Sequence, residues 1–262
     1  MRFILTRLRG LCGYRELFWQ LVVVGIKLKY RRSVLGYLWS VLNPLLIMVI
    51  MALVFSSMFR FDIPNYPVYL LGGSLLFNFM SDSTQRGMTS ILDNAAMLKK
   101  IYIPKYIFTA ASVSAGLVNL LFSLAALVLV MLITRAPLTW HILLAPLVIF
   151  ELYLFCLGLA LFLATATVFF RDMQYLWGVI TTAWMYMTPI FYPPSIWPER
   201  YAIYFKALNP MYSYIAQFRD LVLGAQLPGA HIVLAGFGYA LLALALGCWA
   251  FYRGQDRFIL HI

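Results

Sequence analysis

Long runs of apolar residues alternate with short polar stretches along most of this chain. A run of about 20 apolar residues can cross the hydrocarbon core of a membrane as one helix. We therefore expect an all-α integral membrane protein with a six-span domain covering residues 33–262. The expected spans lie at about residues 34–59, 67–80, 107–133, 140–170, 175–191 and 231–252.

The N-terminal stretch has a different pattern, because apolar and polar residues at positions 14–29 separate onto two helical faces. Such a helix suits the boundary between water and lipid. Residues 1–32 are thus expected to form a cytoplasmic N-terminus that contains an amphipathic interface helix. Its apolar face would consist of Leu17, Leu21, Val24 and Leu28, and its polar face of Glu16, Gln20 and Lys27.

The polar residues 81–105 are interpreted as the main internal loop. Helix signals within it predict a short cytoplasmic helix at about residues 92–103. Asp93 and Asn94 can cap the start of this helix, and Pro104 ends it.

Residues 193–228 precede the last span and contain five prolines. The apolar pieces between these prolines, residues 203–208 and 211–223, are too short to span a membrane. Re-entrant external helices fit this pattern best, and an ordinary external loop is the alternative.

The distribution of positive charge indicates the orientation. With both ends in the cytoplasm, fifteen of the 20 Lys and Arg residues fall inside and five fall outside. Cytoplasmic loops are enriched in Lys and Arg, so this placement is favoured. A seventh span within residues 193–228 would move Arg253 and Arg257 outside, which makes it the weaker topology.

The composition supports the membrane assignment and bears on partners. Hydrophobic residues make up 63% of the chain and charged residues 11%, whereas soluble domains are about half apolar and about a quarter charged. The chain has 20 Lys and Arg against 9 Asp and Glu, and eight of these cations precede residue 33. Topology and anionic lipid explain this charge better than binding of nucleic acid does.

Sequence signals for catalysis, cofactors or metals are missing. The chain contains no GxxxxGK[ST] phosphate loop, so any ATP-driven work would need a partner. Its three cysteines and three histidines have no metal-ligand spacing. We expect no catalytic residue, no cofactor and no metal site in this chain.

Two other functional classes remain open on the residues alone. Glu151 lies in the middle of a span, where ionisable residues are usually functional, so an ion-coupled carrier is one alternative. A hydrogen bond between helices would explain the same residue. A membrane glycosyltransferase is the weaker alternative, because it would need paired carboxylates and the acidic residues here are isolated.

A motif at the start of the first span carries a resemblance to a known family. It reads Tyr30-Arg31-Arg32-Ser33-Val34-Leu35-Gly36-Tyr37-Leu38-Trp39, followed by Leu42, Asn43, Pro44 and Leu45. Further anchors lie at residues 94–104, Arg171-Asp172, Pro189-Ile190-Phe191-Tyr192, Asn209-Pro210-Met211 and Arg219. Together they resemble the permease subunit of ABC-type polysaccharide exporters, which move O-antigen, capsule or teichoic-acid chains.

The resemblance implies a subunit of the bacterial cytoplasmic membrane that moves a polyprenyl-pyrophosphate-linked glycan. It also implies a second copy of the chain and two ATP-binding subunits, which would hold the ATP and Mg. The cytoplasmic helix would meet these subunits through Asn94, Met97, Leu98, Lys99 and Lys100. An exporter of another cargo, such as a drug or a lipid, shares the same plan and is the runner-up.

Two groups of residues are candidates for contact with the glycan. Sugar rings stack on aromatic faces, so the candidates for lining a channel are Tyr37, Trp39, Trp177, Trp184 and Tyr186. Core packing or the interfacial aromatic belt is the alternative explanation for each. Lys27, Arg31 and Arg32 suit the lipid pyrophosphate, and orientation of the first span explains them otherwise.

Overall fold

The computed structural model describes residues 14–29, 33–59 and 63–261, and every regular element within these ranges is helical. The all-α fold expected from the sequence is therefore confirmed for this part of the chain. The α-helices are α2 (Arg15–Lys29), α3 (Trp39–Phe59), α4 (Tyr66–Asp93), α5 (Ala95–Leu98), α6 (Tyr106–Ile133), α7 (Ala145–Phe169), α8 (Met173–Met187), α9 (Glu199–Leu208), α10 (Pro210–Val222), α11 (Ala230–Gly254) and α12 (Phe258–His261). The 3-10 helices are η1 (Gly36–Leu38), η2 (Trp140–Leu144), η3 (Pro194–Ile196) and η4 (Gln255–Arg257).

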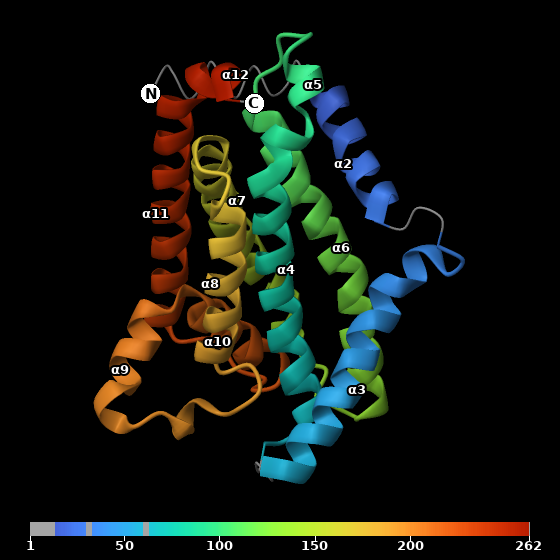
Figure 1. Cartoon of the computed structure of the whole chain (residues 1–262). Helices are drawn as coiled ribbons and strands as arrows, with labels where there is room; N and C mark the ends of the chain where they lie inside the picture. Colours follow the sequence, from blue (N-terminus) through green and yellow to red (C-terminus); the bar gives the residue numbers. More distant parts are fainter. Residues whose placement is uncertain (1–13, 30–32, 60–62, 262) are drawn as a thin grey trace.

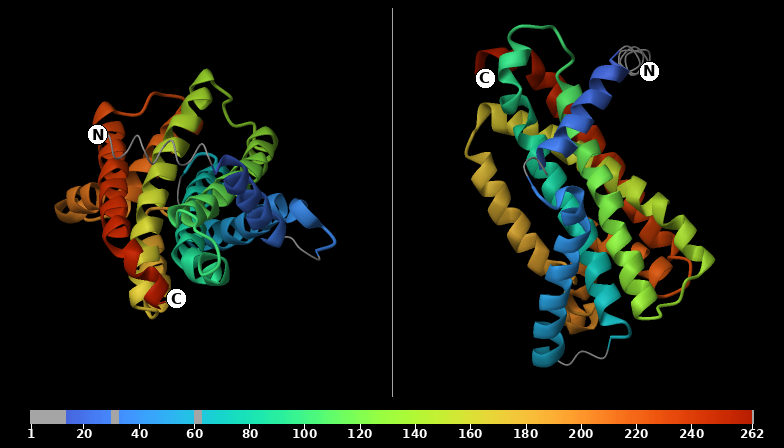
Figure 2. Two further views of the ribbon diagram at one scale, coloured as in Figure 1. Left: turned by 90° about the horizontal axis from the view of Figure 1, so that it is seen from above. Right: turned by 90° about the vertical axis from the view of Figure 1, so that its right-hand side faces the viewer.

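The long helices α3, α4, α6, α7, α8 and α11 run lengthwise through one bundle (Figure 1). The short helices α5 and α12 lie together at one end of the bundle, and α9 and α10 lie at the opposite end. Figure 2 shows the same separation from the side. The two ends of the bundle are therefore built from different parts of the sequence.

Four stretches of the described chain are long and apolar enough to cross a membrane: Gly36–Val54, Tyr106–Ile133, Trp140–Phe169 and Ala230–His261. Two other helices that run along the bundle, α8 and α4, are not among these stretches. α8 has only 15 residues. α4 has 28 residues, but many of them are polar. The apolar helices identify the chain as an integral membrane protein.

α7 occupies the centre of the bundle and packs most closely against α11 and α4. Gly158 of α7 and Gly247 of α11 let the two helices touch, because a Cβ at either position would overlap backbone atoms of the other helix. Close approach through small residues is a common way for helices to associate inside membranes.

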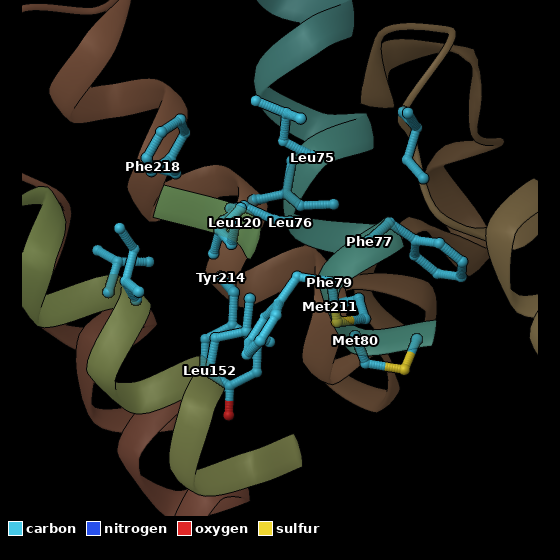
Figure 3. Close-up of a cluster of buried hydrophobic side chains, with 14 of the residues drawn as sticks. Leu75, Leu76, Phe77, Phe79, Met80, Leu120, Leu152, Met211, Tyr214 and Phe218 are labelled. Carbon is cyan, nitrogen blue, oxygen red and sulfur yellow. The ribbon is translucent and has the colours of Figure 1, made fainter. Parts of the chain in front are cut away.

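The core lies between α4, α6, α7 and α10, and Figure 3 shows part of it. Leu76, Met80, Leu152 and Tyr214 are fully buried there. These side chains come from one face of each helix, which fixes how α4 and α10 are rotated against α7.

Helix α2 corrects the apolar face expected from the sequence. α2 packs on α6 through Phe18, Leu21 and Val22, whereas Val24 and Leu28 are exposed. Small residues decide this rotation, because Gly25 sits so close to α6 that an added Cβ would lie 3.2 Å from the Cβ of Ala115.

The expected internal loop at residues 81–105 is wrong in its first half, because α4 continues without a break to Asp93. Met88 and Ile91 in this half are completely buried. This half of α4 is polar on its exposed face and apolar on its packed face. Its average composition therefore resembles that of a loop. Between α4 and α6, only Asn94 and residues 99–105 lack a regular element.

Pro44 lies inside α3, where its missing N–H leaves the carbonyl of Ser40 without its helical partner. The hydroxyl of Ser123, on α6, donates a hydrogen bond to this carbonyl at 2.9 Å. A neighbouring helix thus satisfies the backbone group that the proline frees, as a membrane interior requires.

Candidate functional site

The exposed face of α4 is polar along most of its length. The polar side chains on this face recur at helical spacing. We call them the polar stripe, and they are Ser74, Asn78, Ser81, Asp82, Gln85 and Thr89. Asn78, Asp82 and Gln85 are exposed, and the other three are half-buried. Hydrocarbon cannot hydrogen-bond such groups, so this face of α4 is suited to contact water or protein rather than lipid.

The polar stripe lies between two other helices. α4 packs against α3 on one side and against α8 on the other, and Figure 1 shows it between them. Both flanking helices expose apolar and aromatic side chains, including Tyr37 before α3 and Tyr175 and Tyr186 on α8. The result is a surface with polar groups along its middle and aromatic groups along its edges.

A pocket of about 530 Å³ opens beside the polar stripe, between α3, α4 and α6. Asn78 and Asp82 belong to both the stripe and the pocket. Other polar lining residues are Lys29, Ser33, Ser40, Asn43, Arg86, Asn119 and Ser123, and Trp39 contributes an aromatic wall. We call this the α3–α4 pocket.

An ion pair borders the α3–α4 pocket. The ammonium of Lys29, at the end of α2, lies 3.5 Å from the carboxylate of Asp82. Burial lowers the pKa of Lys29, while the carboxylate of Asp82 acts in the opposite direction and Arg86 adds to the lowering. Two cations and one carboxylate therefore meet where α2 ends beside α4.

The five aromatic candidates for a channel lining fall into two groups. Tyr37, Trp39 and Tyr186 are exposed by 48%, 39% and 61%. Trp177 is buried and donates its indole N–H to Thr84 of α4 at 3.1 Å. Trp184 is half-buried and donates to the side-chain oxygen of Asn209 at 2.8 Å. The two tryptophans of α8 thus attach this helix to α4 and α10, and the other three present exposed ring surface.

The cationic candidates are only partly described. Lys27 is exposed on α2, on the same helix as Lys29. Tyr30, Arg31 and Arg32 lie outside the described residues, so their candidate roles stay predictions. Among the other motif residues, Ser33, Trp39 and Pro44 line the α3–α4 pocket, while Leu35 and Gly36 form the start of η1.

At the far end of the bundle, motif residues from three parts of the chain meet around Arg219. The guanidinium of Arg219 donates to the carbonyls of Pro189 at 2.7 Å, Ile190 at 3.1 Å and Tyr69 at 3.3 Å. It also lies 3.4 Å from the ring centroid of Tyr69. The hydroxyl of Tyr69 in turn donates to the carbonyl of Tyr192 at 2.9 Å. This cluster fastens the segment after α8 to α4 and α10.

Asn209 anchors the start of α10. Its side-chain oxygen accepts the backbone N–H of Met211 at 3.1 Å, which is an N-cap. Its amide donates to the hydroxyl of Thr188 at 3.0 Å. Spacing along the chain does not by itself indicate that residues 188–192, 209 and 219 share one network.

The candidates on the α5 side divide by burial. Leu98 is buried, where it joins a small apolar cluster with Ile107 and Phe258. Met97, Lys99 and Lys100 are exposed, and the side-chain amide of Asn94 donates to the carbonyl of Ser90 at 2.8 Å. Sequence reasoning passed over Tyr102, which is 93% exposed just before Pro104. An aromatic residue two positions before Pro104 was the available signal.

Glu151 lies away from the polar stripe, in the interior between helices. It is completely buried on α7 and accepts a hydrogen bond from the side-chain amide of Gln217, on α10, at 3.1 Å. Gly236 of α11 leaves room for this pair, because a Cβ there would overlap both side chains. The geometry supports the interhelical hydrogen bond considered for this residue.

Known proteins resemble this chain over nearly its whole length. The family model for the ABC-2 type transporter matches residues 16–223. The O-antigen export system permease protein RfbA of Myxococcus xanthus is 36% identical over 252 residues, covering 95% of this chain and 96% of that protein. The protein of the same name from Klebsiella pneumoniae is 29% identical over 253 residues, covering 94% and 95%. The polysialic acid transport protein KpsM of Escherichia coli is 24% identical over 251 residues, covering 90% and 92%.

Proposed function

Because the chain belongs to the ABC-2 type transporter family, we propose that it is the transmembrane subunit of an ATP-driven exporter of lipid-linked polysaccharide. The names of its relatives, for O-antigen export and polysialic acid transport, support a polysaccharide as cargo. In this proposal the chain forms the path through the bacterial cytoplasmic membrane, and a separate subunit binds and hydrolyses ATP.

The observation that carries the proposal is the polar stripe of α4. A helix whose exposed face holds Asn78, Asp82 and Gln85 is poorly suited to contact lipid. A glycan carries many hydroxyl groups, and it needs donors and acceptors along its route to replace water. The stripe supplies such groups over several helical turns, so we assign it to the wall of the path.

Two copies of the chain are needed to enclose this path. One copy leaves the stripe open on the side flanked by α3 and α8. A second copy placed face to face would cover both stripes and leave a polar lumen between them. The exposed rings of Tyr37, Trp39 and Tyr186 would then border the lumen, where sugars can stack on them.

The proposed topology has six spans, namely α3, α4, α6, α7, α8 and α11. The bundle end with α5 and α12 faces the cytoplasm, as the distribution of Lys and Arg favours. α2 then lies at the cytoplasmic interface. α9 and α10 lie at the external end, where α10 re-enters the membrane and is held by Arg219.

We place the ATP-binding subunits against the cytoplasmic end, one for each copy. Lys99, Lys100 and Tyr102 are exposed beside α5 and suit contact with a partner. Leu98 points into the apolar cluster below, so it would transmit movement of α5 to α6 and α12. Lys27, Arg31 and Arg32 remain candidates for the pyrophosphate that links the glycan to its lipid.

Export in cells tests the proposal directly. Deleting this chain should abolish surface glycan while lipid-linked glycan accumulates inside the cell. Transport by the purified chain and its ATP-binding subunit in vesicles should require ATP and should continue when ion gradients are collapsed. Surface glycan that stays normal after deletion would refute the proposal, and transport driven by an ion gradient alone would indicate a secondary carrier.

A further inference from the structure

We propose that the α3–α4 pocket is a binding site for one sugar unit of the cargo. The inference rests on the proposed function and adds to it a specific subsite in the wall of the path. The pocket volume, about 530 Å³, lies within the range of about 300–1,000 Å³ that is usual for small-ligand sites. It opens on the polar stripe, so a glycan in the path reaches it without crossing lipid.

The side chains that line the pocket match the chemistry of sugar hydroxyls. Asn43, Asn78, Asp82 and Arg86 come from two facing helices, and each presents polar atoms side by side on a planar group. Neighbouring hydroxyls of a sugar ring can pair with two such atoms at once: they donate to both oxygens of a carboxylate, accept from a guanidinium, and do one of each with an amide. Amides serve both needs, which makes the two asparagines the central residues of the site.

These two amides are available for a ligand. Within the described part of the chain, no hydrogen bond engages the side chains of Asn43 or Asn78, and both are exposed to the pocket. By contrast, the less exposed asparagines Asn94 and Asn209 have protein partners for their amides. The pocket therefore offers two asparagine amides that can form hydrogen bonds with a ligand.

An apolar wall completes the pattern. Trp39 lines the pocket and is 39% exposed, so part of its ring remains open to a ligand. One face of a sugar ring carries C–H groups that pack well on an aromatic ring. Polar planar groups together with an indole in one lining distinguish this pocket from a simple water-filled gap.

The ion pair in the lining limits the positive charge that the pocket offers to the pyrophosphate of the lipid carrier. The carboxylate of Asp82 lies in the pocket and already holds Lys29 at 3.5 Å. A diphosphate placed here would meet this carboxylate at close range, which opposes binding. Arg86 is the remaining described cation of the lining, and it suits a hydroxyl as well as a phosphate.

The backbone around the pocket is held in place without a ligand. Pro44 lines it, and the hydrogen bond from Ser123 to the carbonyl of Ser40 ties α3 to α6 at its base. A fixed pocket does not lose ordering entropy when a sugar enters, which favours binding.

The test measures binding to the exporter purified with its ATP-binding subunit and placed in lipid nanodiscs. The probe is the glycan that accumulates in cells lacking this chain, released from its lipid by mild acid and labelled at its reducing end. Anisotropy should show saturable binding to the wild type. Asn78→Ala, Asn43→Ala and Trp39→Ala should each weaken binding by roughly tenfold, the loss expected for one or two ligand contacts. Trp140→Ala is the matched control, because Trp140 is an exposed tryptophan remote from the pocket.

Several outcomes would overturn the inference. Binding that is unchanged in all three pocket variants would place the sugar elsewhere. Competition by inorganic pyrophosphate, lost in Arg86→Gln but not in Asn78→Ala, would make the pocket a phosphate site. Basal ATP hydrolysis and co-purification confirm that each variant is folded. Failure of the proposed function is recognised separately, because surface glycan would then persist without this chain.

Discussion

The hydroxyl of Ser123 on α6 donates to the carbonyl of Ser40 on α3, and this carbonyl is free only because Pro44 lacks an N–H. The two helices are thus joined at the point where one of them is interrupted. We expect Ser123→Ala to lower the free energy of unfolding by about 1 kcal/mol, because it leaves a buried carbonyl unsatisfied. Thermal unfolding in detergent measures this loss.

A double substitution provides the control for this prediction. Pro44→Ala restores an N–H that can reach the carbonyl of Ser40 within α3. In that background Ser123→Ala should cost clearly less stability than in the wild type. Equal costs in both backgrounds would show that the proline and the serine act independently.

A larger side chain at the contact between α7 and α11 should strongly disturb folding of the chain. Gly158→Leu should reduce the amount of folded chain severely, because the backbone of Ala243 occupies the space that its Cβ needs. Size-exclusion profiles of a fluorescent fusion report the folded fraction. Gly238→Ala on the same α11 is the control, since nothing lies within 4 Å of its added Cβ, and it should preserve the profile.

Lysine should not be able to replace Arg219 in this cluster. Arg219 reaches three carbonyls through its forked guanidinium, and an ammonium cannot span them. We expect Arg219→Lys to destabilise the chain by about 2 kcal/mol, seen as a lower unfolding temperature. Lys206→Ala, which removes an exposed cation on nearby α9, should leave that temperature unchanged. Equal behaviour of the two variants would exclude an anchoring role for Arg219.

Substitutions around α5 should affect partner binding and stability separately, because Tyr102 is exposed and Leu98 is buried. Tyr102→Ala should weaken co-purification of the ATP-binding subunit and leave thermal stability within about 0.5 kcal/mol, because Tyr102 is almost fully exposed. Leu98→Asp should instead destabilise the chain itself, since it buries a charge in an apolar cluster. Undiminished co-purification with Tyr102→Ala and Lys99→Glu combined would move the partner surface away from this segment.

The polar stripe predicts a loss of export without a loss of folding. Asn78→Leu combined with Gln85→Leu removes two exposed polar groups from α4 and should preserve or raise thermal stability. Surface glycan, detected with antibody on intact cells, should fall to background. Leu241→Met, on the exposed face of α11, serves as the control and should export normally. Normal export by the double variant would remove the stripe from the path.

The sequence predicted the apolar helices well and the polar one poorly. α6 and α7 follow long apolar runs, and their ends fall close to the expected positions. The mean composition predicts a loop for the second half of α4, because averaging over a window mixes Asp82 and Gln85 with the buried Met88 and Ile91. The helical spacing of these residues, rather than their mean hydropathy, indicates that the segment is a helix.

The candidate site was predictable only in part for a related reason. The motif around Trp39 and Pro44 pointed to the correct region, and both residues line the α3–α4 pocket. The contribution of Asn78 and Asp82 depends on how α4 is rotated, which the packing of its other face decides. The partners of Arg219 lie about 30 and 150 positions away, and no local spacing encodes such contacts.

The open polar stripe also constrains how the protein is made. A newly inserted single copy would hold Asn78, Asp82 and Gln85 against lipid until it met another copy, and each of these groups costs free energy there. In the proposed two-copy path, pairing would have to follow insertion promptly, because an unpaired copy leaves this polar face of α4 against lipid. The cellular level of the chain would then be set by assembly as well as by synthesis.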